Sequence, residues 1–215
     1  MSTIRRAKQL DGWCSTVLAC LLSGLLVAAC AAPHGAARQP EPATGQPRLQ
    51  VLDQGRELAY RGPITFEATA LLADFLGKYP IQLVTITSEG GYLGPALEMS
   101  QLLLDQGVTT FVPTRCLSGC TLLFLAGGPR FVGPGAALGF HRSAPVHELP
   151  EGAVLRYGDA DLGAWMAARG VAEEFIARVL ATPATTLWFP SHRELRDAGV
   201  IDAVLPRERL PDHAP

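Results

Sequence analysis

Ser118 and His141 are the residues of this chain best suited to nucleophilic chemistry. Ser118 lies in the segment CLSGC at 116–120, between an apolar strand-like run and an apolar helix-like run, and His141 follows 23 residues later. An imidazole within hydrogen-bond reach can take the proton of a hydroxyl and turn its oxygen into a nucleophile. The intervening residues are enough for one helix and a return strand. The pattern therefore predicts that Ser118 and His141 face each other.

Glycines near the expected site could supply backbone N–H groups for the oxyanion that forms during acyl transfer. Gly119 directly follows Ser118, and Gly90 and Gly91 follow a strand expected at 81–86. Because glycine has no Cβ, a substrate carbonyl can approach its N–H group closely. We expect Gly119, with Gly90 or Gly91, to form the oxyanion hole. The Gly-Gly turn could also hold an extended peptide by strand-like pairing.

Each of these residues also has a simpler structural interpretation. Serine is a favoured N-cap of helices, so Ser118 could serve only to begin the helix that follows it. The Gly-Gly pair could be an ordinary tight turn, and His141 could be a hydrogen-bonded histidine at the edge of the core. For the other histidines after residue 140, we expect no catalytic role: His147, His192 and His213.

Cys116 and Cys120 bracket the serine turn and are a candidate disulfide. Five cysteines occur in the chain, and the other three lie in its N-terminal region: Cys14, Cys20 and Cys30. In an oxidising compartment a helix turn that begins between Cys116 and Cys120 could bring their sulfurs together. The alternative is a pair of small buried hydrophobes. A metal site needs more ligands than this pair offers, so we expect no metal and no other cofactor.

The first 29 residues have the features of a bacterial lipoprotein signal peptide. Basic residues precede an apolar stretch at 13–29, which ends in the sequence VAAC at 27–30. This end resembles a lipobox, in which the cysteine becomes lipid-modified and N-terminal, and here it would be Cys30. Ala31 in the next position suggests the outer membrane, facing the periplasm. The alternative is an ordinary signal peptide cut near Ala29.

Composition divides the remaining chain into a linker, one domain and a tail. The segment 30–48 is rich in Pro, Ala, Gly and Gln and reads as a flexible tether. Residues 49–206 are enough for one domain with its own core, and 207–215 are expected to be a loose tail. A net charge of −2 and the lack of a basic stripe argue against nucleic-acid binding.

Strand-like and helix-like segments alternate along the domain, which predicts a layered α/β arrangement. The expected strands lie at 58–60, 81–86, 108–113, 131–132 and 137–140, and the expected helices lie at 65–79, 95–106, 120–126, 161–180 and 192–198.

At this point the order of segments resembles the proteolytic subunit of Clp protease and its relatives in the crotonase-like group. The resemblance rests on the strand-to-helix turn at 86–91, the serine turn at 116–120, the histidine segment at 140–145 and the closing segment at 189–202. It implies repeated ββα units, with layered sheets flanked by helices. It also implies a serine hydrolase, expected to be a peptidase, in which Ser118 is the nucleophile and His141 the general base.

One position departs from the pattern of this family. The acidic member of the triad would fall near Pro183, where the chain has no carboxylate. Thr182, Thr185 or a backbone carbonyl could orient His141 instead, or Asp159 or Asp161 could reach it from the preceding loop. The resemblance further implies a peptide or protein substrate and self-assembly into homo-oligomers, whereas no motif for docking an ATPase is recognisable.

Two other functions are also compatible with this fold, because one fold can host several activities. The chain could be a catalytically inactive peptide-binding or scaffold protein, for which the missing carboxylate is the best support. It could also be an acyl-thioester enzyme that uses the oxyanion hole without needing Ser118.

Overall fold

The computed structural model describes residues 45–144 and 157–211, which contain one main sheet of six strands. The order is β1-β2-β3-β4-β6-β8, and every neighbouring pair is parallel except the antiparallel pair β1 and β2. The strands are β1 (Arg48–Leu52), β2 (Glu57–Arg61), β3 (Leu83–Thr87), β4 (Thr109–Val112), β6 (Arg130–Val132) and β8 (Ala203–Val204). The predicted signal peptide and Cys30 lie outside the described residues.

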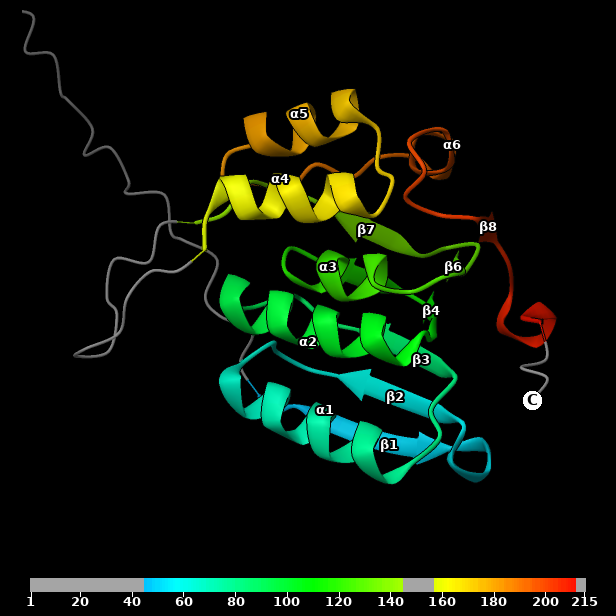
Figure 1. Cartoon of the computed structure of the whole chain (residues 1–215). Coiled ribbons are helices and arrows are strands. Elements are labelled where there is room, and N and C mark those ends of the chain that lie inside the picture. The colour runs from blue at the N-terminus through cyan, green and yellow to red at the C-terminus, as the bar shows by residue number, and fades with distance from the viewer. Residues whose placement is uncertain (1–44, 145–156, 212–215) are drawn as a thin grey trace, which may run out of the picture. The chain divides into compact units, whose positions relative to one another are not determined.

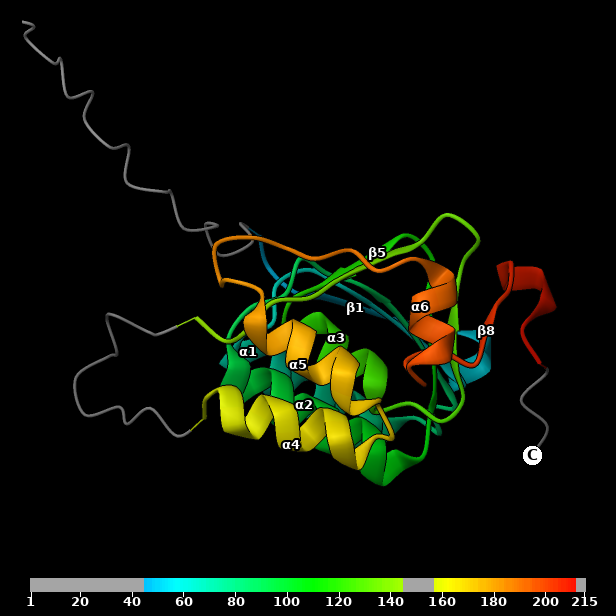
Figure 2. The ribbon, with the colours of Figure 1, turned by 90° about the horizontal axis from the view of Figure 1, so that it is seen from above.

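Three helices alternate with the parallel strands and lie together on one side of the main sheet (Figures 1 and 2). They are α1 (Phe66–Lys78), α2 (Leu93–Gln106) and α3 (Cys120–Leu125). The hydroxyl of Thr65 caps α1 by accepting a hydrogen bond from Ala68 N at 3.1 Å. Gly107 ends α2 in the left-handed conformation, with φ 68°. Between these helices and the sheet lies the main hydrophobic core.

The C-terminal segment packs against a second, smaller apolar cluster of the main sheet. Leu83, Phe111 and Phe131 form this cluster, and Leu205 and Leu210 pack against it. Central strands β3 and β4 are therefore covered on both faces, which explains why their residues are almost all buried.

Part of the expected loose tail is ordered, which corrects the predicted end of the domain at 206. The segment Arg207–Arg209 forms a short 3-10 helix, η2, and Arg207 forms an ion pair with the buried carboxylate of Glu57. Arg207 also donates a hydrogen bond to Thr85 Oγ1 at 3.1 Å. A buried carboxylate needs such a partner, so this contact fixes the chain past residue 206. Residues 212–215 lie outside the described residues.

A second, two-stranded sheet carries the segments of interest for function. It pairs β5 (Arg115–Leu117) with β7 (Ala137–Gly139) in parallel. A bridge between Ser88 and Cys116 joins β5 to the segment that leaves β3, and an antiparallel bridge joins Phe140 to Trp188. The chain thus has the expected layered sheets flanked by helices, and that prediction of the fold class is confirmed.

The single helix expected at 161–180 is in fact two helices. They are α4 (Asp159–Ala168) and α5 (Glu173–Ala181), which lie against each other beside α3 (Figure 1). Gly170 has φ 79°, a left-handed conformation that ends α4 and redirects the chain. The remaining short elements are η1 (Asp53–Gly55) and α6 (His192–Asp197). None of the helices within 45–144 and 157–211 is both long and apolar enough to span a bilayer.

Candidate active site at the ends of β5 and β7

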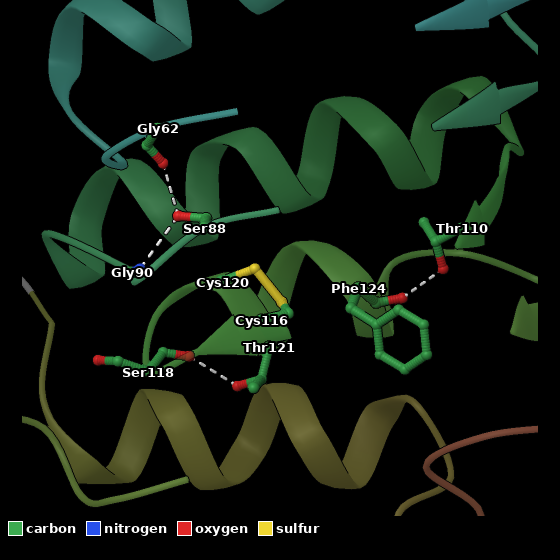
Figure 3. Close-up of a disulfide and its surroundings, with 9 residues drawn as sticks. All are labelled: Gly62, Ser88, Gly90, Thr110, Cys116, Ser118, Cys120, Thr121 and Phe124. Carbon is green, nitrogen blue, oxygen red and sulfur yellow. Dashed lines mark hydrogen bonds between the residues drawn. A yellow bond between two sulfur atoms is a disulfide. The ribbon is translucent and has the colours of Figure 1, made fainter. Parts of the chain in front are cut away.

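Ser118 occupies a sharp strand-to-helix turn. It lies between the end of β5 at Leu117 and the start of α3 at Cys120, and its φ of 55° is in the left-handed region. Left-handed backbone is uncommon outside glycine and is a known device for exposing a reactive side chain at a turn. The hydroxyl points away from α3, and the side chain is partly accessible to solvent (Figure 3). Ser118 is not a side-chain cap, because no side-chain capping bond begins α3.

His141 is brought to the same end of the small sheet as Ser118. Leu117 in β5 is in register with Gly139 in β7, and the pairing continues through a hydrogen bond from Ser118 N to Gly139 O at 2.8 Å. Because the two strands are parallel, the residues that follow each of them lie at the same end of the small sheet. The topology therefore places the serine and histidine segments at the same end of the small sheet, and the facing of the two side chains stays a prediction. No hydrogen bond joins Ser118 Oγ to the His141 ring in the described residues.

The ring of His141 lies against a backbone carbonyl. Its Nδ1 lies 2.5 Å from the carbonyl oxygen of Arg142. When Nδ1–H donates to this oxygen, the neutral ring carries its lone pair on Nε2, the tautomer that a general base needs. Arg142 is in turn held by a bond from its N to the carbonyl oxygen of Thr182 at 3.0 Å. Of the candidates considered from the sequence, a backbone carbonyl is the one in contact.

The polar side chains considered as orienting groups have other partners. Asp159 Oδ1 accepts hydrogen bonds from the N and Oγ of Ser143 at 2.7 and 2.5 Å. Asp161 Oδ2 accepts from Gly158 N at 2.8 Å at the start of α4. The Thr182 hydroxyl donates to the carbonyl of Arg178 at 2.8 Å. Neither these groups nor Thr185 contacts the His141 ring through a hydrogen bond in the described residues.

The Gly-Gly turn lies directly against the serine turn. A Cβ added to Gly90 would lie 2.7 Å from Ser118 Cβ, and one added to Gly119 would lie 3.7 Å from Gly91 N. The N–H group of Gly90 donates to Ser88 Oγ at 3.0 Å, so it is already used within the fold. The expectation that Gly90 could be an oxyanion donor is therefore corrected. By contrast, Gly91 N and Gly119 N have no hydrogen-bond acceptor in the described residues.

Ser88 is a residue of this site that the sequence analysis did not single out. Besides accepting from Gly90 N, its hydroxyl donates to Gly62 O at 2.6 Å, which fixes the start of the Gly-Gly turn (Figure 3). Ile64 N donates to Gly90 O at 2.9 Å and Tyr92 N donates to Ile64 O at 3.1 Å. A serine two residues before a glycine is a known turn pattern and could have identified this role.

Cys116 and Cys120 form a disulfide, as expected from their spacing. Their Cα atoms are 5.3 Å apart, and the bond spans the serine turn (Figure 3). Both residues are fully buried. No cluster of three or more possible metal-binding side chains occurs among the described residues. Outside the turn, an exposed ion pair between Glu89 and Arg115 links the Gly-Gly turn to the start of β5.

The fold is similar to that of solved ClpP proteins. Two structures of ClpP1 from Listeria monocytogenes, one of them a point variant, are 16% and 18% identical to this chain, with TM-scores of 0.58 and 0.57. In each comparison the match covers 72% of this chain and 94% of the ClpP1 chain. No sequence-family model matches the chain, and no curated protein matches it. The protein therefore has a ClpP-like fold, and the predicted resemblance is confirmed at that level.

Proposed function

We propose that this protein is a serine hydrolase that cleaves peptide bonds, with Ser118 as nucleophile and His141 as general base. The observation that carries the proposal is the Ser118 turn: a left-handed serine at the end of β5, which pairs with the strand β7 that leads to His141. The backbone of Gly91 and Gly119 lies next to this turn. The ClpP-like fold supports the same chemistry. Ser118 and His141 would each touch the reacting atoms, so both would be catalytic residues.

The proposed reaction has two halves. Ser118 Oγ attacks the carbonyl carbon of the peptide while His141 Nε2 takes the hydroxyl proton, and the oxyanion accepts hydrogen bonds from Gly91 N and Gly119 N. The C–N bond then breaks, and the proton moves from His141 to the leaving amine. In the second half, water gives a proton to His141 Nε2 while its oxygen attacks the acyl carbon. The bond between that carbon and Ser118 Oγ then breaks, and His141 returns the proton to Ser118 Oγ. Hydrogen bonds of this kind are often long without substrate and tighten when it binds.

The carbonyl that contacts His141 Nδ1 is neutral, and this is expected to lower the rate of catalysis. The Arg142 carbonyl can select the imidazole tautomer, but unlike a carboxylate it brings no full charge to stabilise the imidazolium. We therefore expect slow turnover compared with an enzyme that has a complete triad. This feature also favours the second candidate, a peptide-binding protein that has the same fold but no activity.

A fluorophosphonate probe distinguishes the candidates. Under the proposal, the wild-type protein forms a covalent adduct and Ser118→Ala forms none, because the attacking oxygen is gone. The measurement is intact-protein mass spectrometry, with circular dichroism to confirm that the variant is folded. An unlabelled wild type would favour the binding protein. Thioester hydrolysis that survives in Ser118→Ala would instead favour the acyl-thioester enzyme.

We also propose that the protein is lipid-anchored through Cys30 in the cell envelope, facing the periplasm, where it would assemble with copies of itself. The basic start, the apolar stretch and the VAAC end support the anchor. Expressed in a Gram-negative host, Cys30→Ala should move from the membrane to the soluble fraction, and the wild-type N-terminal peptide should carry acyl chains. A wild-type protein that is already soluble would contradict the anchor without touching the hydrolase proposal.

A further inference from the structure

The backbone at Ser118 needs support from its surroundings. A serine at φ 55° is in a conformation that costs free energy outside glycine, and such conformations persist only where neighbouring contacts over-determine them. Two hydrogen bonds reach the Ser118 carbonyl, from Thr121 N at 2.9 Å and Thr121 Oγ1 at 2.8 Å. A third bond runs from Ser118 N to Gly139 O. These contacts fix the two peptide groups of Ser118.

The disulfide is the covalent part of this support. It joins Cys116, inside β5, to Cys120, the first residue of α3, so that the serine turn lies within the closed loop. Both cysteines are fully buried and belong to the main core. A reductant in solution could reach the sulfurs only after local opening of the structure. The bond therefore stays formed in the folded protein and does not act as a redox switch.

The short span of the disulfide argues for a local role. In the chain-entropy account, a disulfide stabilises a protein by restricting the unfolded chain, and this effect is smallest for the shortest loops. Here the two cysteines are only four positions apart. The main effect of the bond is therefore expected on the geometry of residues 117–119 and less on the free energy of unfolding of the whole domain.

We propose that Cys116 and Cys120 are positioning residues, whose disulfide holds the Ser118 hydroxyl and the Gly119 N–H group in the geometry needed for attack. This inference rests on the proposed hydrolase function. Without the bond, the end of β5 and the start of α3 can separate, and Ser118 can relax toward an ordinary backbone conformation. A misplacement of about 1 Å can lower a rate on the order of 10²-fold.

The test compares the rate constant of fluorophosphonate labelling in the full-length protein and two variants. The double variant Cys116→Ala/Cys120→Ala removes the disulfide. Thr110→Val is the matched control, because it removes a buried hydrogen bond of 2.7 Å to Phe124 O at the far end of α3 and leaves the turn untouched (Figure 3). Thermal unfolding is measured for each protein, and labelling is measured well below every Tm. If the double alanine variant does not fold, Cys116→Val/Cys120→Ala refills the buried space and replaces it.

We expect the disulfide variant to label at least about 10-fold more slowly than the wild type, with the same pH dependence, while Thr110→Val labels at the wild-type rate despite a lowered Tm. An unchanged pH dependence would show that the base is intact and that the nucleophile is misplaced. Labelling of the disulfide variant within twofold of Thr110→Val would overturn the inference and leave the hydrolase proposal standing. A wild type that does not label at all would overturn both.

Discussion

Replacing His141 with alanine should lower the rate of fluorophosphonate labelling by about 10² to 10⁴-fold, the range that a general base contributes. The reason is that, in the proposed reaction, His141 is the group that takes the Ser118 proton. Labelling kinetics followed by intact-protein mass spectrometry would measure this effect.

His192→Ala is the matched control for this prediction. The His192 ring is partly buried and its Nε2 lies 2.7 Å from the carbonyl oxygen of Ala136, so its loss removes a structural hydrogen bond and leaves the site intact. His192→Ala should label at the wild-type rate. Imidazole added to the buffer should partly restore labelling of His141→Ala and have no such effect on Ser118→Ala. Equal rates for His141→Ala and wild type would exclude His141 as the base.

Gly90→Ala should reduce labelling by on the order of 10²-fold or more, although Gly90 donates no hydrogen bond to substrate in our account. A Cβ at this position would lie 2.6 Å from the Leu117 carbonyl oxygen and 2.7 Å from Ser118 Cβ. Both atoms belong to the serine turn, so the added carbon must push the Gly-Gly turn and the serine turn apart. The φ of 99° at Gly90 adds backbone strain of about 1 to 3 kcal/mol for an alanine.

Gly77→Ala provides the comparison for Gly90→Ala. Gly77 lies within α1, and a Cβ added there would meet no atom within 4 Å. This variant should label normally and unfold with a free energy about 0.5 to 1 kcal/mol higher than that of the wild type, because alanine favours a helix over glycine. If Gly90→Ala also labelled normally while folded, the close packing of the two turns would have no role in positioning Ser118.

The sequence predicted those parts of the fold that follow from periodicity and turn residues. The amphipathic pattern of 65–79 and the glycine after Gln106 located α1 and α2 to within about two residues. The order of segments was enough to recognise the ClpP-like arrangement. Gly170 was overlooked as a helix end, because the apolar pattern continues across it into α5 and the conformation of a single glycine cannot be read from periodicity.

The sequence indicated which positions belong to the candidate active site, but it did not indicate which hydrogen bonds their groups make. The spacing of Ser118 and His141 placed both at one end of neighbouring strands, which depends only on topology. Which glycine keeps a free N–H group depends on the Ser88 hydroxyl, and which group faces His141 depends on the path of the chain beyond Arg142. The contact between Arg207 and Glu57 is also tertiary and joins residues 150 positions apart. The pattern of residue types within a short stretch of sequence cannot reveal contacts between residues that are far apart in the chain.

The most direct test of the proposed active site is a crystal structure of the protein after reaction with a fluorophosphonate. The proposal predicts phosphorus bonded to Ser118 Oγ, with one phosphoryl oxygen within about 2.7 to 3.1 Å of both Gly91 N and Gly119 N. The His141 ring should lie beside the adduct, with its Nδ1 still on the Arg142 carbonyl. A protein that remains unmodified, or an adduct whose phosphoryl oxygen points away from these two N–H groups, would contradict the account.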